Sequence, residues 1–178
     1  MNATASKGLS MPNIDLSRAV SDDIPFIMAC ERRPGYEEQV GRWEEGKHLK
    51  RLADADYAYL IGSSNGVPRG FVILRDLLGE TDSLYLKRIA TYDANLGFGK
   101  PFIAAVTDWV FAHTRFHRFW LEVVEENVRA LHVYKSLGWT VEGRVREAFA
   151  KPDGTRGSYI QMSTLKFEWP EIRAKCES

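Results

Sequence analysis

The strongest pattern in the chain is the run of residues 84–139, LYLKRIATYDANLGFGKPFIAAVTDWVFAHTRFHRFWLEVVEENVRALHVYKSLGW. It reads as an apolar strand, a glycine-rich turn at residues 94–100 (ANLGFGK), a helix, a second strand and a second helix. A glycine-rich turn that leads from a strand into a helix presents unpaired backbone N–H groups, which bind anions. This pattern predicts a site for a ligand that carries phosphate.

Two common nucleotide-binding motifs do not fit this turn. A dinucleotide-binding fingerprint needs a third glycine at position 102, where the chain has Phe102, and a P-loop needs Gly at 94 and Ser or Thr after the lysine, where it has Ala94 and Pro101. What remains is Gly97-x-Gly99, whose neighbouring amides could wrap a diphosphate. A flexible corner with one glycine at positive φ would have the same sequence, so the turn alone leaves both interpretations open.

The second helix places Asn127, Ala130 and Tyr134 on one narrow face. These residues therefore point at the same neighbour. An alternative is purely structural, with Asn127 as an N-cap, Ala130 as a close-packing spacer and Tyr134 in the core.

The rest of the chain alternates expected strands and helices. Strands are expected at residues 14–20, 57–61, 70–74, 83–91, 119–124, 139–148 and 158–165. Helices are expected from residue 24 to the Pro34-Gly35 break and at residues 36–55, 100–113 and 128–137. This order predicts an α/β or α+β domain with a mixed sheet.

Length and composition favour one domain without a membrane span. The 178 residues carry 24 Lys plus Arg and 24 Asp plus Glu, so no overall charge recruits nucleic acid, and no apolar run approaches the roughly 20 residues of a membrane helix. We expect a flexible N-terminal tail at residues 1–12, a domain at 13–168 and a C-terminal tail at 169–178. The first residues lack the apolar core of a secretion signal, so the cytoplasm is the expected compartment.

Cysteine and histidine spacing points away from metal binding. Cys30 and Cys176 lie far apart, without CxxC or Cys/His spacing. The four histidines show no metal-ligand pattern either. We expect no metal cofactor and no disulfide.

Together, the turn and the second helix resemble the GNAT superfamily of acyl-CoA-dependent N-acetyltransferases. The hallmarks of that superfamily are a strand, a Gln/Arg-x-x-Gly-x-Gly/Ala loop for pyrophosphate and a later helix with Asn and Tyr. Here the loop is residues 94–99, with Ala94 in place of the usual Gln or Arg. The segment around residues 122–134 and residues 142–147 are similar to the ribosomal-protein N-terminal acetyltransferase branch. The resemblance implies a single α/β (α+β) domain with a central mixed, mostly antiparallel sheet of about seven strands flanked by helices.

The resemblance also implies acetyl-CoA as cosubstrate and a set of residues that contact it. Backbone groups of the fourth expected strand would face the pantetheine arm, turn amides would bind the diphosphate, and Lys135 would be a weaker phosphate contact. The implied contacts are Ile89, Ala90, Asn95, Leu96, Gly97, Phe98, Gly99, Lys100, Asn127, Ala130, Tyr134 and Lys135.

Acetyl transfer needs a neutral amine, a polarised carbonyl and a protonated leaving thiolate. Tyr134 is the predicted acid, because a phenol of pKa about 10 can protonate a thiolate whose thiol has a pKa of about 8.5. Glu122 is the predicted base, since it is a carboxylate in an otherwise apolar strand and matches a glutamate base of the ribosomal-protein branch. An ion-paired structural Glu122 is the alternative, with a water relay or Glu31 as base. The amide of Ile89 or Ala90 is the predicted oxyanion donor.

The acceptor is expected to be a primary amine, either a protein N-terminus or a small molecule. In the superfamily it is chosen largely by the region that corresponds to residues 31–50, where Glu31 and Tyr36 are the predicted acceptor contacts. A solvated helix face is the alternative for this charged region. A protein acceptor predicts an open groove beside Tyr134, and a small amine predicts a pocket closed by the hairpin tip near Asp153.

The resulting prediction is an N-acetyltransferase in which the amine attacks acetyl-CoA directly in a ternary complex. A non-catalytic CoA-binding regulatory or scaffold domain is the alternative. Both a monomer and a homodimer remain open.

Overall fold

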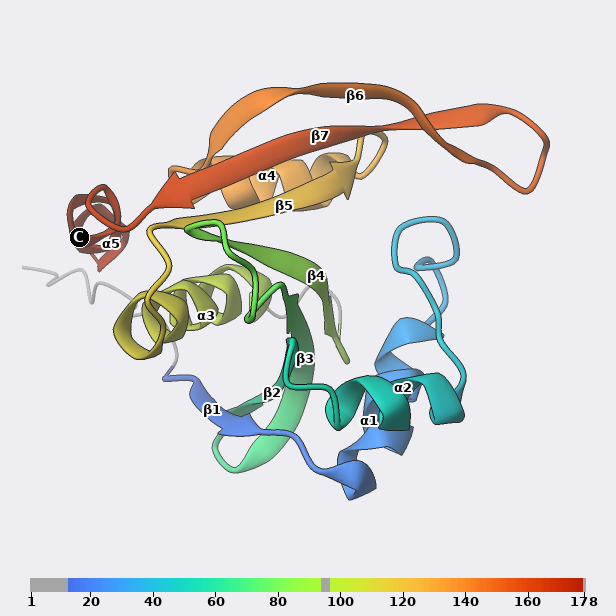
Figure 1. Ribbon diagram of the computed structural model, residues 1–178, viewed down its shortest axis with the longest axis horizontal. Coiled ribbons are helices and arrows are strands. Elements are labelled where there is room, and N and C mark those ends of the chain that lie inside the picture. The colour runs from blue at the N-terminus through green and yellow to red at the C-terminus, as the bar shows by residue number, and fades with distance from the viewer. Residues whose placement is uncertain (1–12, 94–96, 178) are drawn as a thin grey trace, which may run out of the picture.

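The computed structural model describes residues 13–93 and 97–177, which form a seven-stranded sheet with helices on both faces (Figure 1). The strands are β1 (Asp15–Arg18), β2 (Tyr57–Ser64), β3 (Val67–Arg75), β4 (Ser83–Thr91), β5 (Arg118–Val124), β6 (Thr140–Ala150) and β7 (Arg156–Leu165). The helices are α1 (Ile24–Glu31), α2 (Glu45–Leu52), α3 (Gly99–His113), α4 (Val128–Ser136) and α5 (Trp169–Glu177), with a short 3-10 turn at Ser21–Asp23. None of the described helices is long and apolar enough to cross a membrane.

The sheet is mixed and mostly antiparallel, as predicted. Its strand order is β1-β2-β3-β4-β5-β7-β6, and within the described residues β4 and β5 are parallel while the other neighbouring strands are antiparallel. The parallel pairing joins Ser83–Leu86 to Arg118–Leu121 and then stops. Beyond Leu86, therefore, one edge of β4 has no strand partner among the described residues. The site described below forms at this gap.

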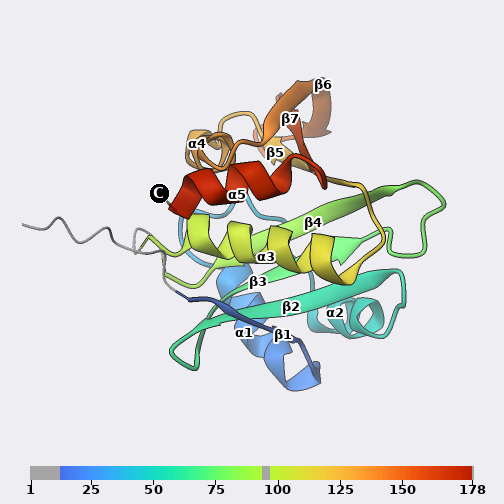
Figure 2. The same ribbon diagram turned by 90° about the vertical axis from the view of Figure 1, so that its left-hand side faces the viewer.

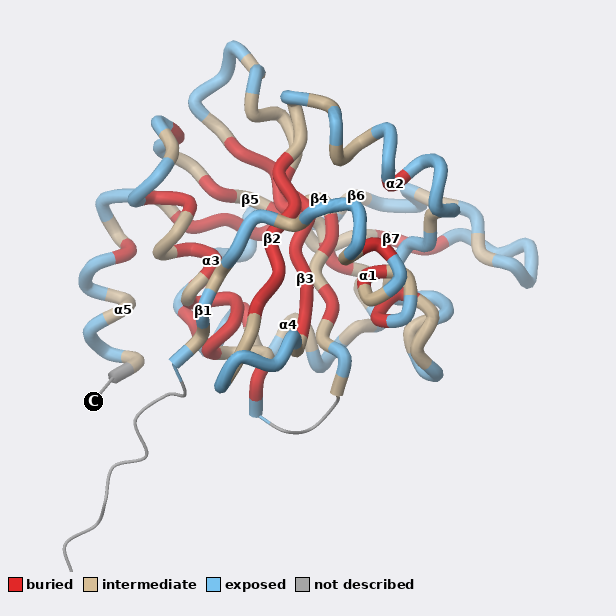
Figure 3. Tube along the Cα trace, turned by 90° about the horizontal axis from the view of Figure 1, so that it is seen from below, coloured by how far each residue is buried: buried red, intermediate tan, exposed pale blue. Residues whose placement is uncertain are grey.

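Two apolar clusters hold the helices against the sheet. The larger one joins α3, α4 and α5 to one face, and the smaller one joins α1 to the other face of β2, β3 and β4. Figure 2 shows α3 and α5 on the near side of the sheet. Buried positions concentrate in the central strands, whereas β6 is exposed along most of its length (Figure 3). The smaller cluster leaves room on its face of the sheet, where residues of β4, β5 and β7 line a cavity.

The hairpin expected around Asn65-Gly66 is present. Asn65 has φ +53° and Gly66 has φ +73°, the positive values that a tight turn between right-twisted strands requires. Asn and Gly adopt this conformation more easily than other residues, which is why the turn was recognisable.

A continuous helix over residues 36–55 is wrong, because regular helix begins only at Glu45. The backbone N–H of Trp43 donates to Glu31 Oε2 at 3.2 Å, and the Trp43 carbonyl accepts from Arg32 Nη2 at 3.1 Å. These side chains satisfy the peptide groups that a helix would otherwise pair. Residues 33–44 therefore form a loop, here called the α1–α2 loop, that crosses beside the sheet.

The C-terminal segment is also more ordered than the expected tail at residues 169–178. Trp169 begins α5, is 4% exposed and donates its indole N–H to Asp108 Oδ1 on α3 at 2.6 Å. Ile172 packs against Gly138 just after α4, where an added Cβ would lie 3.0 Å from the Ile172 side chain. The segment closes one end of the larger apolar cluster. The other expected tail, residues 1–12, lies outside the described residues.

Candidate functional site

Among the described residues, two cavities lie beside the gap between β4 and β5. The smaller, of about 440 Å³, is lined by the α1–α2 loop, β4, β5 and the β6–β7 hairpin. The larger, of about 580 Å³, is lined by the same loop, the end of β4 and the first turns of α3 and α4. Both are lined by Gln39, Val40, Ile89, Asn127, Ala130 and Tyr134. The cavities therefore meet at these side chains and form one cleft through the gap.

The glycine turn borders the larger cavity. Gly97 has φ +71°, and an added Cβ at Gly97 or Gly99 would meet no heavy atom of the described residues within 4 Å. Gly99 starts α3, whose first N–H groups have no partner within the helix and whose N-terminal end carries partial positive charge. With Lys100 also at the cavity, this arrangement fits a diphosphate.

The other predicted cofactor contacts are Phe98, Asn95 and Leu96 of the turn and Lys135 of α4. Phe98 is buried and its ring lies 5.2 Å from the ring of Phe102, so its side chain supports the turn from the core. Asn95 and Leu96 lie outside the described residues. Lys135 is exposed and lines neither cavity. Phe98 and Lys135 therefore line neither cavity, although Phe98 lies between Gly97 and Gly99, which line the larger one.

Two cations that the sequence analysis did not select lie at the larger cavity. Arg33 lines it from the α1–α2 loop, where its guanidinium is 5.0 Å from the Tyr36 ring and donates to the Thr91 carbonyl at 3.4 Å. Arg129 lines it from the first turn of α4. Arg129 could have been predicted from the sequence, because it lies two residues after Asn127, at the start of a helix beside the glycine turn.

Asn127 is an N-cap, which is the structural role that the sequence left open as the alternative. It is the N-cap of α4, and its Oδ1 accepts the backbone N–H of Ala130 at 3.1 Å. Both residues nevertheless line both cavities. The cap sets where α4 begins at the cleft and, through the helical repeat, directs Tyr134 into it.

Tyr134 is 4% exposed, and its ring lies 5.4 Å from the ring of Trp139. Its hydroxyl has no hydrogen-bond partner within the described part of the chain. Burial raises the pKa of this phenol above its ordinary value, because the phenolate would lose its solvation. The site thus holds a phenol that stays protonated where the two cavities meet.

Glu122 projects from the middle of β5 into the smaller cavity. It is half-buried, and the hydroxyl of Tyr85 on β4 donates to its Oε2 at 3.4 Å. The carboxylate has no ion-pair partner among the described residues, so the ion-paired alternative is not observed. Glu122 and Tyr134 line the same cavity from different elements.

Ile89 and Ala90 line the larger cavity, and Ile89 lines the smaller one as well. Both belong to the part of β4 that pairs with β3 but not with β5. Backbone groups on the free edge are available to a ligand, as the prediction of an oxyanion donor requires.

Glu31 does not line either cavity. Its side chain is fully buried, where it forms an ion pair with Arg88 and lies 3.2 Å from His48 Nε2. It cannot meet an acceptor there, which corrects its selection as an acceptor contact or substitute base. Its position supports Arg88, which does line the smaller cavity.

Tyr36 lies at the larger cavity, on the same side of the cleft as the glycine turn. Its hydroxyl shares a hydrogen bond with Thr91 Oγ1 at 3.3 Å. The acidic residues of the loop that line the smaller cavity are Glu37 and Glu38 instead. The loop therefore contributes carboxylates at Glu37 and Glu38, within the charged region expected to meet the acceptor, and not at Glu31.

The smaller cavity also contains residues that the sequence analysis missed. Lys87 and Arg88 come from β4, and Phe149 and Tyr159 come from the hairpin, with their rings stacked 4.7 Å apart. Lys87 and Arg88 are charged residues within the apolar strand 84–91. A charged residue within an apolar strand is also the pattern by which Glu122 was predicted. No residue of the described chain forms a group of three or more His, Cys, Asp or Glu side chains placed to hold a metal ion.

The chain was compared with family models, with curated proteins and with solved structures. The model of the acetyltransferase (GNAT) family matches residues 25–139. Comparison of the sequence with curated proteins found no match. Among solved structures, the chain is similar to spermidine N-acetyltransferase from Vibrio cholerae in complex with CoA and spermine, at 21% identity and TM-score 0.77, with 88% of this chain and 98% of that chain covered. It is also similar to the ribosomal-protein-S18-alanine N-acetyltransferase from Escherichia coli, at 23% identity and TM-score 0.69, with 86% and 94% covered.

Proposed function

The chain belongs to the GNAT family of acetyltransferases, which use acetyl-CoA as cosubstrate, and we propose that the two joined cavities are its active site. The larger cavity takes the cofactor and the smaller one takes the amine. The observation that carries this assignment is that both cavities are lined by Tyr134, a buried residue whose hydroxyl has no hydrogen-bond partner within the part of the chain that the structure describes. It brings an acid, a carboxylate and an anion-binding turn to one cleft.

The cofactor half is organised around backbone groups. Amides of the turn at Gly97–Lys100 bind the diphosphate, assisted by the positive end of α3. Lys100, Arg33 and Arg129 add positive charge at the same cavity. The free edge of β4 at Ile89 and Ala90 binds the pantetheine arm and supplies an N–H to the carbonyl oxygen of the thioester.

In the transfer itself, Glu122 accepts the proton that the amine loses as its nitrogen forms a bond to the acetyl carbon. Tyr134 donates its proton to the sulfur as the carbon–sulfur bond breaks. The products are an N-acetylated amine and free CoA, so atoms and charge balance without a covalent enzyme intermediate. The Tyr85 hydroxyl, bonded to Glu122, helps hold the carboxylate in the cavity.

The acceptor is a primary amine. Proteins of the same fold act on a polyamine or on a protein alanine, according to their names, and both are amines. Glu37 and Glu38 line the smaller cavity and attract an ammonium group. Asp153, at the hairpin tip, lines neither cavity, so no closure of the cavity by that tip is observed.

The test is thiol release on mixing the protein with acetyl-CoA and a panel of amines. The Tyr134→Phe variant is expected to lower kcat by more than about tenfold, the usual scale of acid catalysis, with little change in acetyl-CoA affinity. Tyr57→Phe is a matched control, since Tyr57 lies at the start of β2 and lines neither cavity. It should leave kcat unchanged.

Two outcomes would contradict the proposal. Tight acetyl-CoA binding with no turnover on any amine or peptide would indicate the non-catalytic CoA-binding domain. Absence of any calorimetric signal when folded protein meets CoA or acetyl-CoA would remove the cofactor assignment altogether.

A further inference from the structure

Lys87 is a half-buried cation in the smaller cavity that the proposed chemistry does not use. No described residue forms a hydrogen bond or an ion pair with its ammonium, and the nearest aromatic contact is the Tyr85 ring at 5.7 Å. The neighbouring cations are already paired, Arg88 with Glu31 and Arg75 with Asp76 at 2.8 Å. Among these cations, Lys87 alone has no anionic partner in the described structure.

The surroundings of Lys87 disfavour its charge. Burial lowers the pKa of Lys87 below its ordinary value, and the positive charges of Arg75 and Arg88 lower it further, while the Glu122 carboxylate acts in the opposite direction. A partly buried charge is costly unless an opposite charge or a hydrogen-bonding oxygen meets it. An oxygen on a bound acceptor would satisfy this ammonium.

The backbone directs Lys87 into the cavity. In the register between β3 and β4, Leu74 pairs with Leu86 and Ile73 pairs with Arg88, so Lys87 is the extra residue of a β-bulge. A bulge redirects a side chain and often occurs beside active sites. Here it lies where β4 separates from β5, and Glu122 lines the same cavity from β5.

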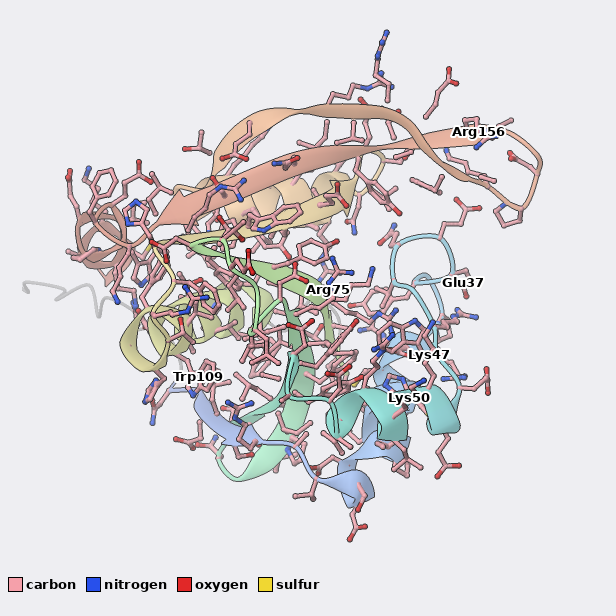
Figure 4. The ribbon with its side chains drawn as sticks, viewed as in Figure 1. Glu37, Lys47, Lys50, Arg75, Trp109 and Arg156 are labelled. Carbon is pink, nitrogen blue, oxygen red and sulfur yellow. The ribbon has the colours of Figure 1, made fainter. Side chains whose placement is uncertain are left out.

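The cavity therefore has two charged walls. The α1–α2 loop supplies Glu37 and Glu38, which suit an ammonium, and β4 supplies the unpaired Lys87. Figure 4 shows Glu37 on the loop and Arg75 nearer the sheet. A molecule with an amine at one end and an oxygen close to it would match both walls. A polyamine would match only the first.

We infer that Lys87 binds a carboxylate or amide carbonyl oxygen of the acceptor, which makes the acceptor an α-amino acid or an aminoacyl compound. This inference rests on the proposed function and specifies its acceptor. The ammonium donates hydrogen bonds to that oxygen and orients the amine toward Glu122. The same charge repels a second ammonium, so acceptors without oxygen and with more than one amine are disfavoured.

The experiment compares four amines that differ in this group: leucine, leucinamide, 3-methylbutylamine and spermidine. The first three share one carbon skeleton and carry a carboxylate, an amide carbonyl or neither. We expect wild-type kcat/KM to be at least about tenfold higher for leucine or leucinamide than for 3-methylbutylamine, the scale of one hydrogen bond to a charged group. The ratio of leucine to leucinamide identifies which oxygen is preferred.

Lys87→Gln should lower kcat/KM for the preferred leucine compound about tenfold, mainly through KM, and leave 3-methylbutylamine unchanged. Spermidine should improve, because the repulsion is removed. Lys87→Arg should retain the preference for oxygen, since a guanidinium also binds carboxylates and carbonyls. The control is Lys50→Gln, at an exposed lysine of α2 that lines neither cavity (Figure 4), and it should behave as wild type.

Calorimetry of the same amines with CoA-saturated protein gives a readout independent of turnover. Tighter binding of leucine or leucinamide than of 3-methylbutylamine, lost in Lys87→Gln, supports the inference. Equal binding of the three leucine-skeleton amines overturns it, and so does an equal loss of activity on all amines in Lys87→Gln, which would mean that Lys87 acts on Glu122. Failure of wild type to acetylate any amine instead contradicts the proposed function, and the binding comparison then still decides the role of Lys87.

Discussion

At the scale of single residues, the cleft holds two ionisable side chains, Tyr134 and Glu122, in different surroundings. Tyr134 is nearly inaccessible and has no partner for its hydroxyl in the described structure, so its phenol keeps its proton. Glu122 is half-buried and bonded to one hydroxyl, so it remains reachable from the cavity. Both lie in regular elements, and such placement holds a catalytic side chain more rigidly than a loop does.

The raised pKa of Tyr134 leads to a prediction of how kcat depends on pH. A raised pKa means that the phenol loses its proton only at a pH above the ordinary value of about 10. With acetyl-CoA and amine both saturating, kcat should therefore not fall between pH 8 and roughly 10. The measurement is the pH profile of kcat. A decline through this range that is absent from Tyr134→Phe would contradict the raised pKa of this phenol, whereas a decline of the same size in both proteins would come from another group.

At the scale of elements, the glycine turn and α3 act as one unit, because the turn sets the direction in which the first amides of the helix point. Gly97 adopts φ +71°, a conformation that costs a residue with a Cβ about 1–2 kcal/mol. Open space surrounds the position where a Cβ would lie. A substitution there acts through backbone strain rather than through a clash.

Gly97→Ala should consequently weaken acetyl-CoA binding about tenfold, the scale of one lost hydrogen bond to a charged group. Gly66→Ala is the matched control, since Gly66 has φ +73°, faces open space and lies in the β2–β3 turn. Both variants should lose about 1–2 kcal/mol of unfolding free energy. Calorimetric titration should separate them, and equal acetyl-CoA affinity in the two variants would argue against a diphosphate site at this turn.

At the scale of the whole molecule, a buried charge cluster joins α1, α2 and the α1–α2 loop to β4. Glu31 contacts Arg88, His48 and the Trp43 backbone, and the loop passes so close that a Cβ at Gly41 would lie 2.6 Å from Arg88 Nη2. This cluster fixes the wall of the smaller cavity. Burial alone would raise the pKa of Glu31, but the His48 hydrogen bond, the Arg88 charge and the Trp43 N–H together lower it below its ordinary value.

Removal of this carboxylate should destabilise the fold. Glu31→Gln leaves Arg88 buried without its partner, for which we expect a loss of about 3–5 kcal/mol at neutral pH. Because the pKa is lower in the folded state, the stabilisation is complete above the unfolded value and disappears as pH falls through the folded one. The difference from wild type should thus stay constant above about pH 5 and narrow at lower pH, as urea unfolding from pH 3 to 7 can measure.

The control for this prediction is Glu44→Gln, which removes an ion pair to Arg32 from a carboxylate whose side chain is 88% exposed. It should change stability by less than about 1 kcal/mol. A comparable loss in both variants, or a pH-independent difference for Glu31→Gln, would show that the buried cluster does not stabilise the fold in this way.

Local sequence patterns were enough to predict most of the strands and helices. Alternation and helical spacing depend only on near neighbours, so they located β4, α3, β5 and α4 to within a residue or two. The conformational demands of Gly97 and the capping role of Asn127 are likewise local. For this reason the amino-acid sequence by itself was sufficient to predict the elements that border the larger cavity and the place of Tyr134 on α4, whereas the cofactor was implied only by the resemblance to the family.

Contacts between distant segments could not be predicted in this way. The Glu31 side chain meets Arg88 across 57 positions, and Trp169 reaches Asp108 across 61, so neither the buried carboxylate nor α5 left a local signal. The same holds for Lys87, whose lack of a partner in the described structure depends on where β4 leaves β5 and on which neighbouring cations are already paired. A side chain's partners depend on which segments the fold brings together, and that packing determined which side chains line the smaller cavity.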